Sequence, residues 1–456
     1  MRLEELIYLT KGSGFDSIVC QTEIKTEEDK AEYSEKGYNI LHTVEEFTTQ
    51  YGIDPTCVWY SPSFSLMVFY FNKESLAVMP LQALYMKTLE GKTDVELVKK
   101  LIRDVESEVA RGDYFSSLMN LTDAMQLDYI RLLVEKKKPC KDLYKLFSIF
   151  YVQSDYGFSS LDREIIDRIV ESKTPAQKGE TTKKLKNLPD VVTVYRGENN
   201  RSTSYKDAYS WTTDEKIAYF FACRHGDGPA NIIKGEVRKK DIIELFDERN
   251  ESEVFVYPDK VKVLGVNELY GLEYIKTVLP IVLSRYQKYR DRMIDELDFD
   301  FDSREHGKLH SARVLLLCLI MAEELKLPTA DKKVLAEAAI YHDSKRTNDG
   351  TDFVHGREGA EYYKSDVRKP DPVVSFICEY HCLEDEEGYE EIKNNRQLSK
   401  NRTRSKLLLN IFKDADNLDL CRFGLKYLDY NKLRLELSKK MVLVAKILYD
   451  QIILPE

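Results

Sequence analysis

Residues 332–343 read KKVLAEAAIYHD, a helix-forming run that ends in a His-Asp doublet. An imidazole and a carboxylate side by side at the end of a helix supply two adjacent metal ligands. One helix cannot surround an ion, so further ligands have to come from other helices. The doublet His342-Asp343 therefore predicts histidines and carboxylates elsewhere in the chain that the fold brings to it.

Further histidines and an aspartate, residue types that bind metal ions, occur before and after the doublet. His310 opens an apolar helix in the run HSARV, His355 stands in HGR, His381 ends a helical run, and Asp416 stands in KDADNL. Five of the seven histidines lie between residues 306 and 381. A metal ion that hydrolyses phosphate esters needs imidazoles and carboxylates around it, because it activates water and neutralises phosphoryl oxygens. The set predicts such a metal centre.

The order of these residues resembles the HD-domain phosphohydrolase superfamily, an all-α metal-binding fold, over about residues 300–425. The resemblance implies one divalent ion (Mn, Mg, Fe, Ni or Zn), with Asp343 also counted as catalytic. Some members hold a second ion through extra histidines between the doublet and the final aspartate, which here would be His355 and His381. The ligands implied for the first ion are His310, His342, Asp343 and Asp416.

Basic residues close to these motifs are candidates to bind the phosphate of a phosphoester substrate. Lys345, Arg346 and Arg357 can hold phosphate as point charges or bidentately, or can be solvated loop charges. His306 stands four residues before His310, on the same helix face. It is open whether His306 contacts substrate or metal, or caps the helix.

A second constellation lies in a strand-rich region at about residues 190–267. A strand Val191–Tyr195 is expected to end in Arg196-Gly197, and the run YSWTT follows at 209–213. The run ESE at 251–253 opens a further strand. An arginine at a strand end can clamp a diphosphate. Two glutamates at i and i+2 point to the same side of an extended segment, where they can stabilise an oxocarbenium-like state and activate an acceptor.

This arrangement resembles the Arg–Ser–Glu-x-Glu class of mono-ADP-ribosyltransferases, which implies NAD as a substrate. The resemblance implies that Glu253 is the essential catalytic residue and that Glu251 favours an arginine acceptor, with Ser210 and Arg196 also catalytic. Where the family has Ser-Thr-Ser, this chain has SWT at 210–212, so the match between this sequence and the motif is weaker. The alternative is a β-sheet domain with surface glutamates. The residues implied to bind NAD are Arg196, Gly197, Ser210, Thr212 and Glu253.

Composition and length favour a globular protein of several domains with an α+β fold. The chain has 456 residues, 43% of them hydrophobic and 32% charged, with a net charge of −10. We expect a mixed N-terminal region at 1–92, an ADP-ribosyltransferase-like domain with a helical N-terminal lobe at 93–272, and an all-α HD domain at 273–456. A polar linker is expected at 173–185 and an exposed loop, suited to be a lid, at 384–406.

The chain start carries no signal-peptide pattern, and no apolar run approaches the ~20 residues that span a bilayer. Together with eight scattered cysteines expected to be reduced, this predicts a cytoplasmic protein without a membrane partner, or one delivered to a host cytosol if it is an effector.

Three functions follow from these features. The first is a bifunctional enzyme that transfers ADP-ribose from NAD to a protein, for example to an arginine, or to a nucleic acid, and hydrolyses a phosphoester, with ADP-ribose itself as one possible target of the hydrolase. The second is an HD nucleotidase or cyclic-nucleotide phosphodiesterase with a non-catalytic nucleotide-binding central module. The third is an ADP-ribosyltransferase effector regulated by a ligand-sensing HD domain.

Overall fold

The computed structural model describes most of the chain from residue 51 onward. The described residues are 19–20, 31, 48–49, 51–61, 67–81, 95–121, 123–154, 161–224, 228–301, 303, 305–350 and 352–451. Much of the predicted N-terminal region 1–92, including the chain start examined for a signal peptide, lies outside them. The chain divides into two compact units, Met1–Asn187 and Leu188–Glu456, which are described separately. The expected boundaries at 92/93 and 272/273 stay predictions.

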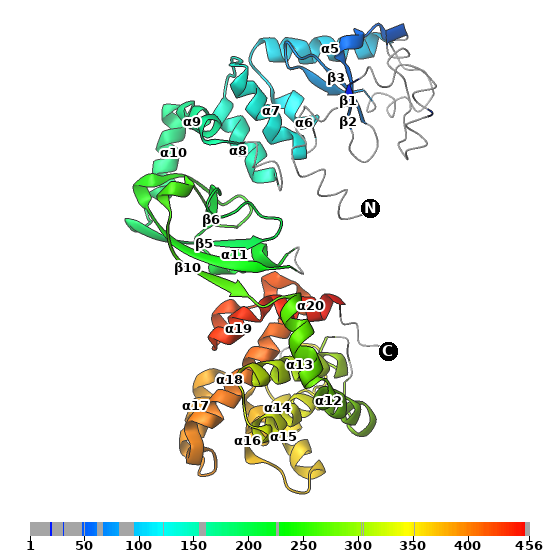
Figure 1. Ribbon diagram of the computed structural model, residues 1–456, viewed down its shortest axis with the longest axis vertical. Helices are drawn as coiled ribbons and strands as arrows, with labels where there is room; N and C mark the ends of the chain where they lie inside the picture. Colours follow the sequence, from blue (N-terminus) through cyan, green and yellow to red (C-terminus); the bar gives the residue numbers. More distant parts are fainter. Residues whose placement is uncertain are drawn as a thin grey trace. The chain divides into compact units, whose positions relative to one another are not determined.

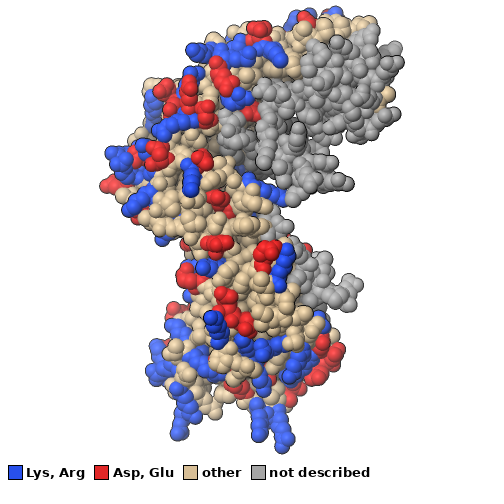
Figure 2. Space-filling model, in the orientation of Figure 1, with Lys and Arg blue, Asp and Glu red and all other residues tan. Residues whose placement is uncertain are grey.

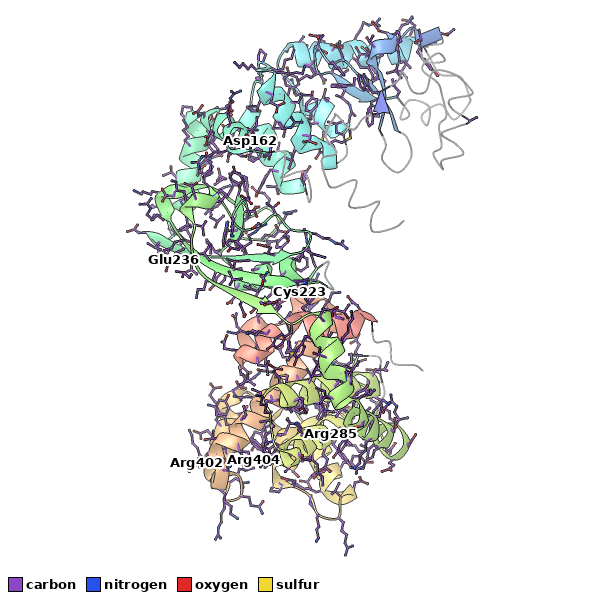
Figure 3. The ribbon with its side chains drawn as sticks, viewed as in Figure 1. Asp162, Cys223, Glu236, Arg285, Arg402 and Arg404 are labelled. Atoms are coloured by element: carbon purple, nitrogen blue, oxygen red, sulfur yellow. The ribbon has the colours of Figure 1, made fainter. Side chains whose placement is uncertain are left out.

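The first unit combines a small antiparallel sheet with helices (Figure 1). The sheet has the order β1-β2-β3-β4. Helices follow the sheet, as expected for the region after residue 92, and Asp162 caps α9 by accepting a hydrogen bond from the backbone N–H of Ile165 (Figure 3). The elements are β1 Val19–Cys20, β2 Val58–Ser61, β3 Met67–Phe71, β4 Val78–Pro80, α5 Val95–Ala110, α6 Phe115–Met119, α7 Asp123–Glu135, α8 Leu143–Gln153, α9 Arg163–Glu171 and α10 Pro175–Leu185.

The linker predicted at 173–185 is wrong, because helix α10 occupies it. Thr174 and Gln177 form a capping box, and Pro175 takes the first helical position, where its missing N–H costs nothing. Of the side chains in α10 only Thr181 is buried, and its hydroxyl accepts a hydrogen bond from Lys173. The helix depends on its cap more than on an apolar stripe.

The second unit begins with a six-stranded antiparallel sheet of order β10-β7-β5-β6-β9-β8. Helix α11, Glu215–Cys223, packs closely on β5. A Cβ on Gly197 would lie 1.8 Å from the carbonyl oxygen of Ala218, so glycine allows this approach. The strands are β5 Val191–Asn199, β6 Ser210–Thr212, β7 Ala230–Arg238, β8 Ile242–Phe246, β9 Glu253–Val256 and β10 Lys262–Leu269.

Helices make up the rest of the second unit (Figure 1). One continuous apolar core joins them to α11, through contacts such as the stacked rings of Tyr219 and Tyr430, 4.5 Å apart. Cys223, at the end of α11, belongs to this core (Figure 3). The α-helices are α12 Leu272–Glu296, α13 Lys308–Glu324, α14 Thr329–Tyr341, α15 His355–Asp366, α16 Pro372–Tyr380, α17 Asp385–Asn394, α18 Arg402–Leu418, α19 Glu436–Lys440 and α20 Val442–Gln451.

The loop predicted at 384–406 is also wrong, because α17, a short 3-10 turn and the start of α18 fill it. Asp385 anchors α17 by accepting hydrogen bonds from Lys413, at 2.8 Å, and Arg434, at 2.7 Å. A segment tied down in this way does not fit the expected lid.

The predicted α+β class is confirmed by the six-stranded sheet and the helical C-terminal region. Within the described part of the chain, no helix combines the length and the apolar character needed to cross a membrane. On the face seen in Figure 2, Lys and Arg side chains are frequent over the helical part of the second unit, although the whole chain is acidic.

Candidate metal centre

The predicted ligands all lie at or near helix ends. His310 is in the first turn of α13, His355 is the first residue of α15, and His381 caps the C-terminal end of α16. His342 caps the end of α14 and Asp343 follows it, as the doublet predicted. Asp416 lies in the last turn of α18. The four histidines and Asp343 are buried, whereas the Asp416 side chain keeps 31% of its surface exposed.

A first group of ligand atoms surrounds Nε2 of His310. This nitrogen lies 3.3 Å from Nε2 of His342, 3.2 Å from Oδ1 of Asp416 and 3.6 Å from Oδ2 of Asp343. The four residues expected to hold one ion are therefore brought together.

A second group lies on the other side of the same carboxylate. Nε2 of His355 is 3.1 Å from Nε2 of His381. Oδ1 of Asp343 lies 3.1 Å from the first of these nitrogens and 3.5 Å from the second. Asp343 thus directs one oxygen to each group and links them.

Hydrogen bonds behind three of the imidazole rings fix their tautomers. Nδ1 of His342 donates to the carbonyl oxygen of Ala339 at 2.9 Å, and Nδ1 of His381 donates to that of Cys378 at 2.7 Å. A carbonyl only accepts, so each Nδ1 carries the proton and each Nε2 presents a lone pair to the centre. Facing lone pairs about 3 Å apart repel unless a cation or proton lies between them, so the donor set fits divalent metal ions.

His310 is held by a buried carboxylate that sequence reasoning missed. Its Nδ1 donates to Oδ2 of Asp419 at 2.8 Å. Arg313 donates to both oxygens of Asp419, at 2.6 and 2.9 Å, and Arg422 donates to Oδ2 at 3.1 Å. Spacing along the helices could have indicated Asp419. It follows Asp416 by three residues, and Arg313 follows His310 by three, so each pair shares one side of the chain.

Electrostatics keep the ligands in their metal-binding forms. Burial lowers the pKa of His342 to about 3, so this imidazole is neutral. Burial opposes ionisation of Asp343, but the neighbouring imidazoles of His342, His355 and His381 outweigh it and hold the pKa well below the ordinary value. Partial burial opposes ionisation of Asp416, but its contact with His310 outweighs this and lowers its pKa.

His310 departs from this pattern. Burial and the charge of Arg422 disfavour its imidazolium form, but its contacts with Asp416 and Asp419 outweigh them and raise its pKa. A metal ion that binds here therefore has to displace a proton.

Of the three basic residues proposed to bind phosphate, one lies beside the ligands. Nη1 of Arg346 is 4.0 Å from Oδ1 of Asp343, and the guanidinium donates to the carbonyl oxygens of Asn348 and Gly350. Lys345 instead donates to Asp300 at 2.7 Å. Arg357 is 72% exposed and lies 3.6 Å from Glu379.

His306 lies next to the centre in the turn that precedes α13, so it does not share a helix face with His310 as the sequence predicted. Its Nδ1 is 2.9 Å from Oδ1 of Asp349, and Ser303 donates to the same oxygen at 2.5 Å. The ring centroids of His306 and His310 are 5.9 Å apart. Burial lowers the pKa of His306 although the bond to Asp349 opposes this, so the ring is neutral at neutral pH.

The residues implied to bind NAD lie on three neighbouring strands of the sheet. Arg196 donates to the carbonyl oxygens of Ser210 and Thr203, both at 2.7 Å. Thr212 on β6 pairs in register with Glu253, a buried residue at the start of β9. The structure brings this set together, with Gly197 next to Arg196 on β5.

Two details of that prediction are wrong. Arg196 and Gly197 lie inside β5 and do not end it, and the Gly197 face that would carry a side chain is filled by α11. Ser252 has a left-handed φ of 47°, so residues 251–253 are not extended and the i, i+2 argument does not apply. Glu251 forms an ion pair with Arg249 at 2.8 Å, and its carbonyl oxygen accepts from Thr212.

Comparison with known proteins supports the first of the two resemblances. A family model described as HD domain matches residues 309–421, a span that contains every predicted metal ligand as well as Asp419. No curated protein and no solved structure matches the chain. None of these comparisons supports an ADP-ribosyltransferase module. Residues 309–421 form an HD domain, and its His/Asp cluster is suited to bind divalent metal.

Proposed function

We propose that this protein is a metal-dependent phosphohydrolase that uses two ions, one in each group of ligands joined by Asp343. The observation that carries the proposal is the pair of facing Nε2 contacts, 3.3 Å between His310 and His342 and 3.1 Å between His355 and His381, on either side of one carboxylate. Bound cations would stabilise these clustered nitrogens and the carboxylate between them, and at His310 an ion would take the place of the proton.

The metal ions, Arg346 and His306 would each have a distinct role in this reaction. When bound, divalent metal lowers the pKa of water and stabilises negative charge on phosphoryl oxygens. Arg346, held rigid by two backbone carbonyls beside Asp343, supplies a guanidinium for a substrate phosphate. His306, with Nδ1 held by Asp349, keeps Nε2 for accepting a proton from the attacking water.

The test is hydrolysis of p-nitrophenyl phosphate, bis(p-nitrophenyl) phosphate and a panel of nucleotides by full-length protein, stripped of metal and reloaded. We expect activity to depend on the added ion and to fall about 1000-fold, roughly 4 kcal/mol, in Asp343→Asn. Asp291→Asn, an exposed carboxylate on α12, is the matched control and should be unchanged. Metal-independent hydrolysis, or full activity of Asp343→Asn, would overturn the proposal.

A second candidate function is transfer of ADP-ribose from NAD to a protein or nucleic acid by the central sheet. It is favoured by one observation, the side-by-side order β5-β6-β9, which places Arg196, Ser210 and Glu253 on adjacent strands. Radiolabelled NAD, incubated with the protein and a lysate, tests it. Label transfer that vanishes in Glu253→Gln would support a transferase, and no transfer with no loss of NAD would leave the sheet a binding module.

If both activities exist, the HD domain could cleave the pyrophosphate of the transferred ADP-ribose and leave phosphoribose on the target. The same incubation, run with Asp343→Asn, separates the two cases. A product that changes in mass between wild type and Asp343→Asn supports processing, and intact ADP-ribose in both excludes it.

A further inference from the structure

Cys382, which directly follows His381, lies in the second group of metal-ligand atoms. One ligand atom each from His355, His381 and Cys382 lie within 4.8 Å of one another. The two histidines are buried and the cysteine is half-buried. A thiolate is a strong ligand for soft and borderline metal ions, so a thiolate beside two imidazoles favours the binding of such an ion.

The close approach of two helix ends places the sulfur there. Gly356 is the second residue of α15, and a Cβ at this position would lie 3.0 Å from Sγ of Cys382 and 2.6 Å from the carbonyl oxygen of Cys378. Glycine therefore lets the start of α15 meet the end of α16. The sulfur makes long contacts to carbonyl oxygens, 3.9 Å to Phe353 and 4.0 Å to Glu379.

His355 differs from the other histidines of the centre in its hydrogen bonds. It is 1% exposed, yet its Nδ1 has no hydrogen-bond partner among the described residues. The carboxylate of Asp352 stays 3.9 Å away, beyond hydrogen-bond reach. The other three histidines of the centre each have Nδ1 bonded to an oxygen. No protein oxygen therefore fixes the tautomer of His355, whose Nε2 is the nitrogen that faces His381 and Asp343.

We propose that the Cys382 thiolate is a protein ligand of the second metal position, together with His355, His381 and Oδ1 of Asp343. The inference rests on the proposed metal centre and deepens it. The second position then offers two nitrogens, one sulfur and one oxygen, which suits Zn²⁺ or Fe²⁺. The first position offers two nitrogens and two oxygens. The two positions therefore differ in the metal they prefer.

Cys378, in the helix α16 that ends just before His381, provides the contrast. It is fully buried four residues earlier, and its Sγ lies 3.8 Å from the carbonyl oxygen of Ala338. It belongs to the apolar core and is not among the clustered ligand atoms. Cys378→Ala is thus a control in which a nearby thiol is lost away from the metal position.

The experiment loads the metal-free full-length protein with Co²⁺ and records its absorption spectrum, then measures Zn²⁺ affinity by titration. We expect a near-ultraviolet thiolate-to-cobalt charge-transfer band in wild type and Cys378→Ala, and its loss in Cys382→Ser. We expect Cys382→Ser to bind the second Zn²⁺ about 10–100-fold more weakly, with the first Zn²⁺ unaffected. A parallel measurement on unmodified wild type follows alkylation of Cys382 by iodoacetamide, which bound Zn²⁺ should slow.

The outcomes separate this inference from the proposed function. Two bound ions with no charge-transfer band, and alkylation of Cys382 at the same rate with and without Zn²⁺, would overturn the thiolate ligand and leave the hydrolase proposal standing. Wild type that binds no metal would overturn both. If Cys382→Ser does not fold, the wild-type spectrum and the alkylation rates decide.

Discussion

The HD domain and the central sheet both carry polar residues in an order that resembles a catalytic family, but their contacts differ. In the HD domain, hydrogen bonds behind the rings of His342 and His381 leave Nε2 facing other donors across the centre. In the sheet, the guanidinium of Arg196 donates to backbone carbonyls and the side of Gly197 is filled by a helix. A metal centre is thus recognised by nitrogen and oxygen atoms that converge where a cation fits, whereas the guanidinium of Arg196 is hydrogen-bonded within the protein.

The largest expected effect separates the two regions directly. His342→Ala removes a fully buried ligand of the first group, so phosphoester hydrolysis should fall at least about 1000-fold, roughly 4 kcal/mol. Glu253→Gln in the sheet should leave the same hydrolysis within about twofold. Steady-state rates with bis(p-nitrophenyl) phosphate measure both. Equal losses in the two variants would break the comparison and tie the sheet to the phosphohydrolase reaction.

The next effect concerns the glycine that was assigned to NAD. In Gly197→Ala the new methyl would overlap the backbone of α11, 1.8 Å from Ala218 O and 2.6 Å from Ala222 N. We expect a loss of about 3 kcal/mol in the free energy of unfolding, measured by urea denaturation. Gly265→Ala on β10, with no atom within 4 Å, should change stability by less than about 0.5 kcal/mol.

A different result for Gly197→Ala would favour the alternative, in which the sheet binds a nucleotide. If the variant unfolds like wild type but no longer binds NAD in a titration, the glycine serves the cofactor and not the packing of α11. The central region would then be a nucleotide site, as its resemblance implied.

The site residues that could be predicted from the sequence are those whose residue type alone indicates their chemistry. Histidine is rare in this chain and its ordered placement, with the His-Asp doublet, predicted ligands that the fold brings together. Asp419 could not be singled out in the same way, because carboxylates are abundant and its role depends on contacts with residues about 100 positions away. Cys382 could not be singled out either, since one cysteine next to a histidine specifies no site.

The wrongly assigned segments share a physical cause. Helix α17 buries only Gly388 and Ile392, and α10 buries only Thr181, so neither has the apolar stripe by which a helix is recognised in sequence. Both start in capping boxes, a local feature that polar composition obscured. The deeply buried helix α13, apolar nearly all round, was by contrast evident from composition.

A moderate effect is expected for His306, which contacts neither group of ligands through a hydrogen bond of the described structure. His306→Ala should lower kcat about 100-fold, as for loss of a general base, with metal content unchanged. Because burial lowers the pKa of His306 below its usual 6.5, wild-type activity should fall only as the pH drops below about 6.5, when the imidazole becomes protonated.

The pH profile is the decisive measurement for His306. The acidic limb should disappear from the profile of His306→Ala because the titrating base is gone. If the variant instead loses a metal ion, measured by elemental analysis, His306 is a ligand and its role as a base is wrong.

A smaller effect is expected for a change of Asp419, the carboxylate that holds the ring of His310. Asp419→Asn weakens the contact that fixes the His310 tautomer, so affinity for the first metal ion should drop about 10–100-fold. Calorimetric titration should show no change for the second ion, whose histidines do not contact Asp419. Asp450→Asn, an exposed carboxylate on α20, is the matched control. Equal weakening of both ions would show that Asp419 supports the domain as a whole.

The smallest effect tests whether α17 is anchored, as the structure has it, or able to open as a lid. Burial disfavours the charged form of Asp385, but hydrogen bonds from Arg434 and Lys413 outweigh it and lower its pKa. A lowered pKa stabilises the fold above the unfolded value of about 3.9, and this stabilisation is lost as the pH falls through the folded value. Asp385→Asn should therefore cost about 1 kcal/mol at pH 7, and the difference from wild type should shrink between pH 5 and 3 in thermal or urea unfolding. Glu386→Gln, exposed in the same turn, should show neither effect. A difference that is absent at pH 7, or that does not shrink in acid, would mean that the ion pairs do not hold α17, and would return this segment to the role of a lid.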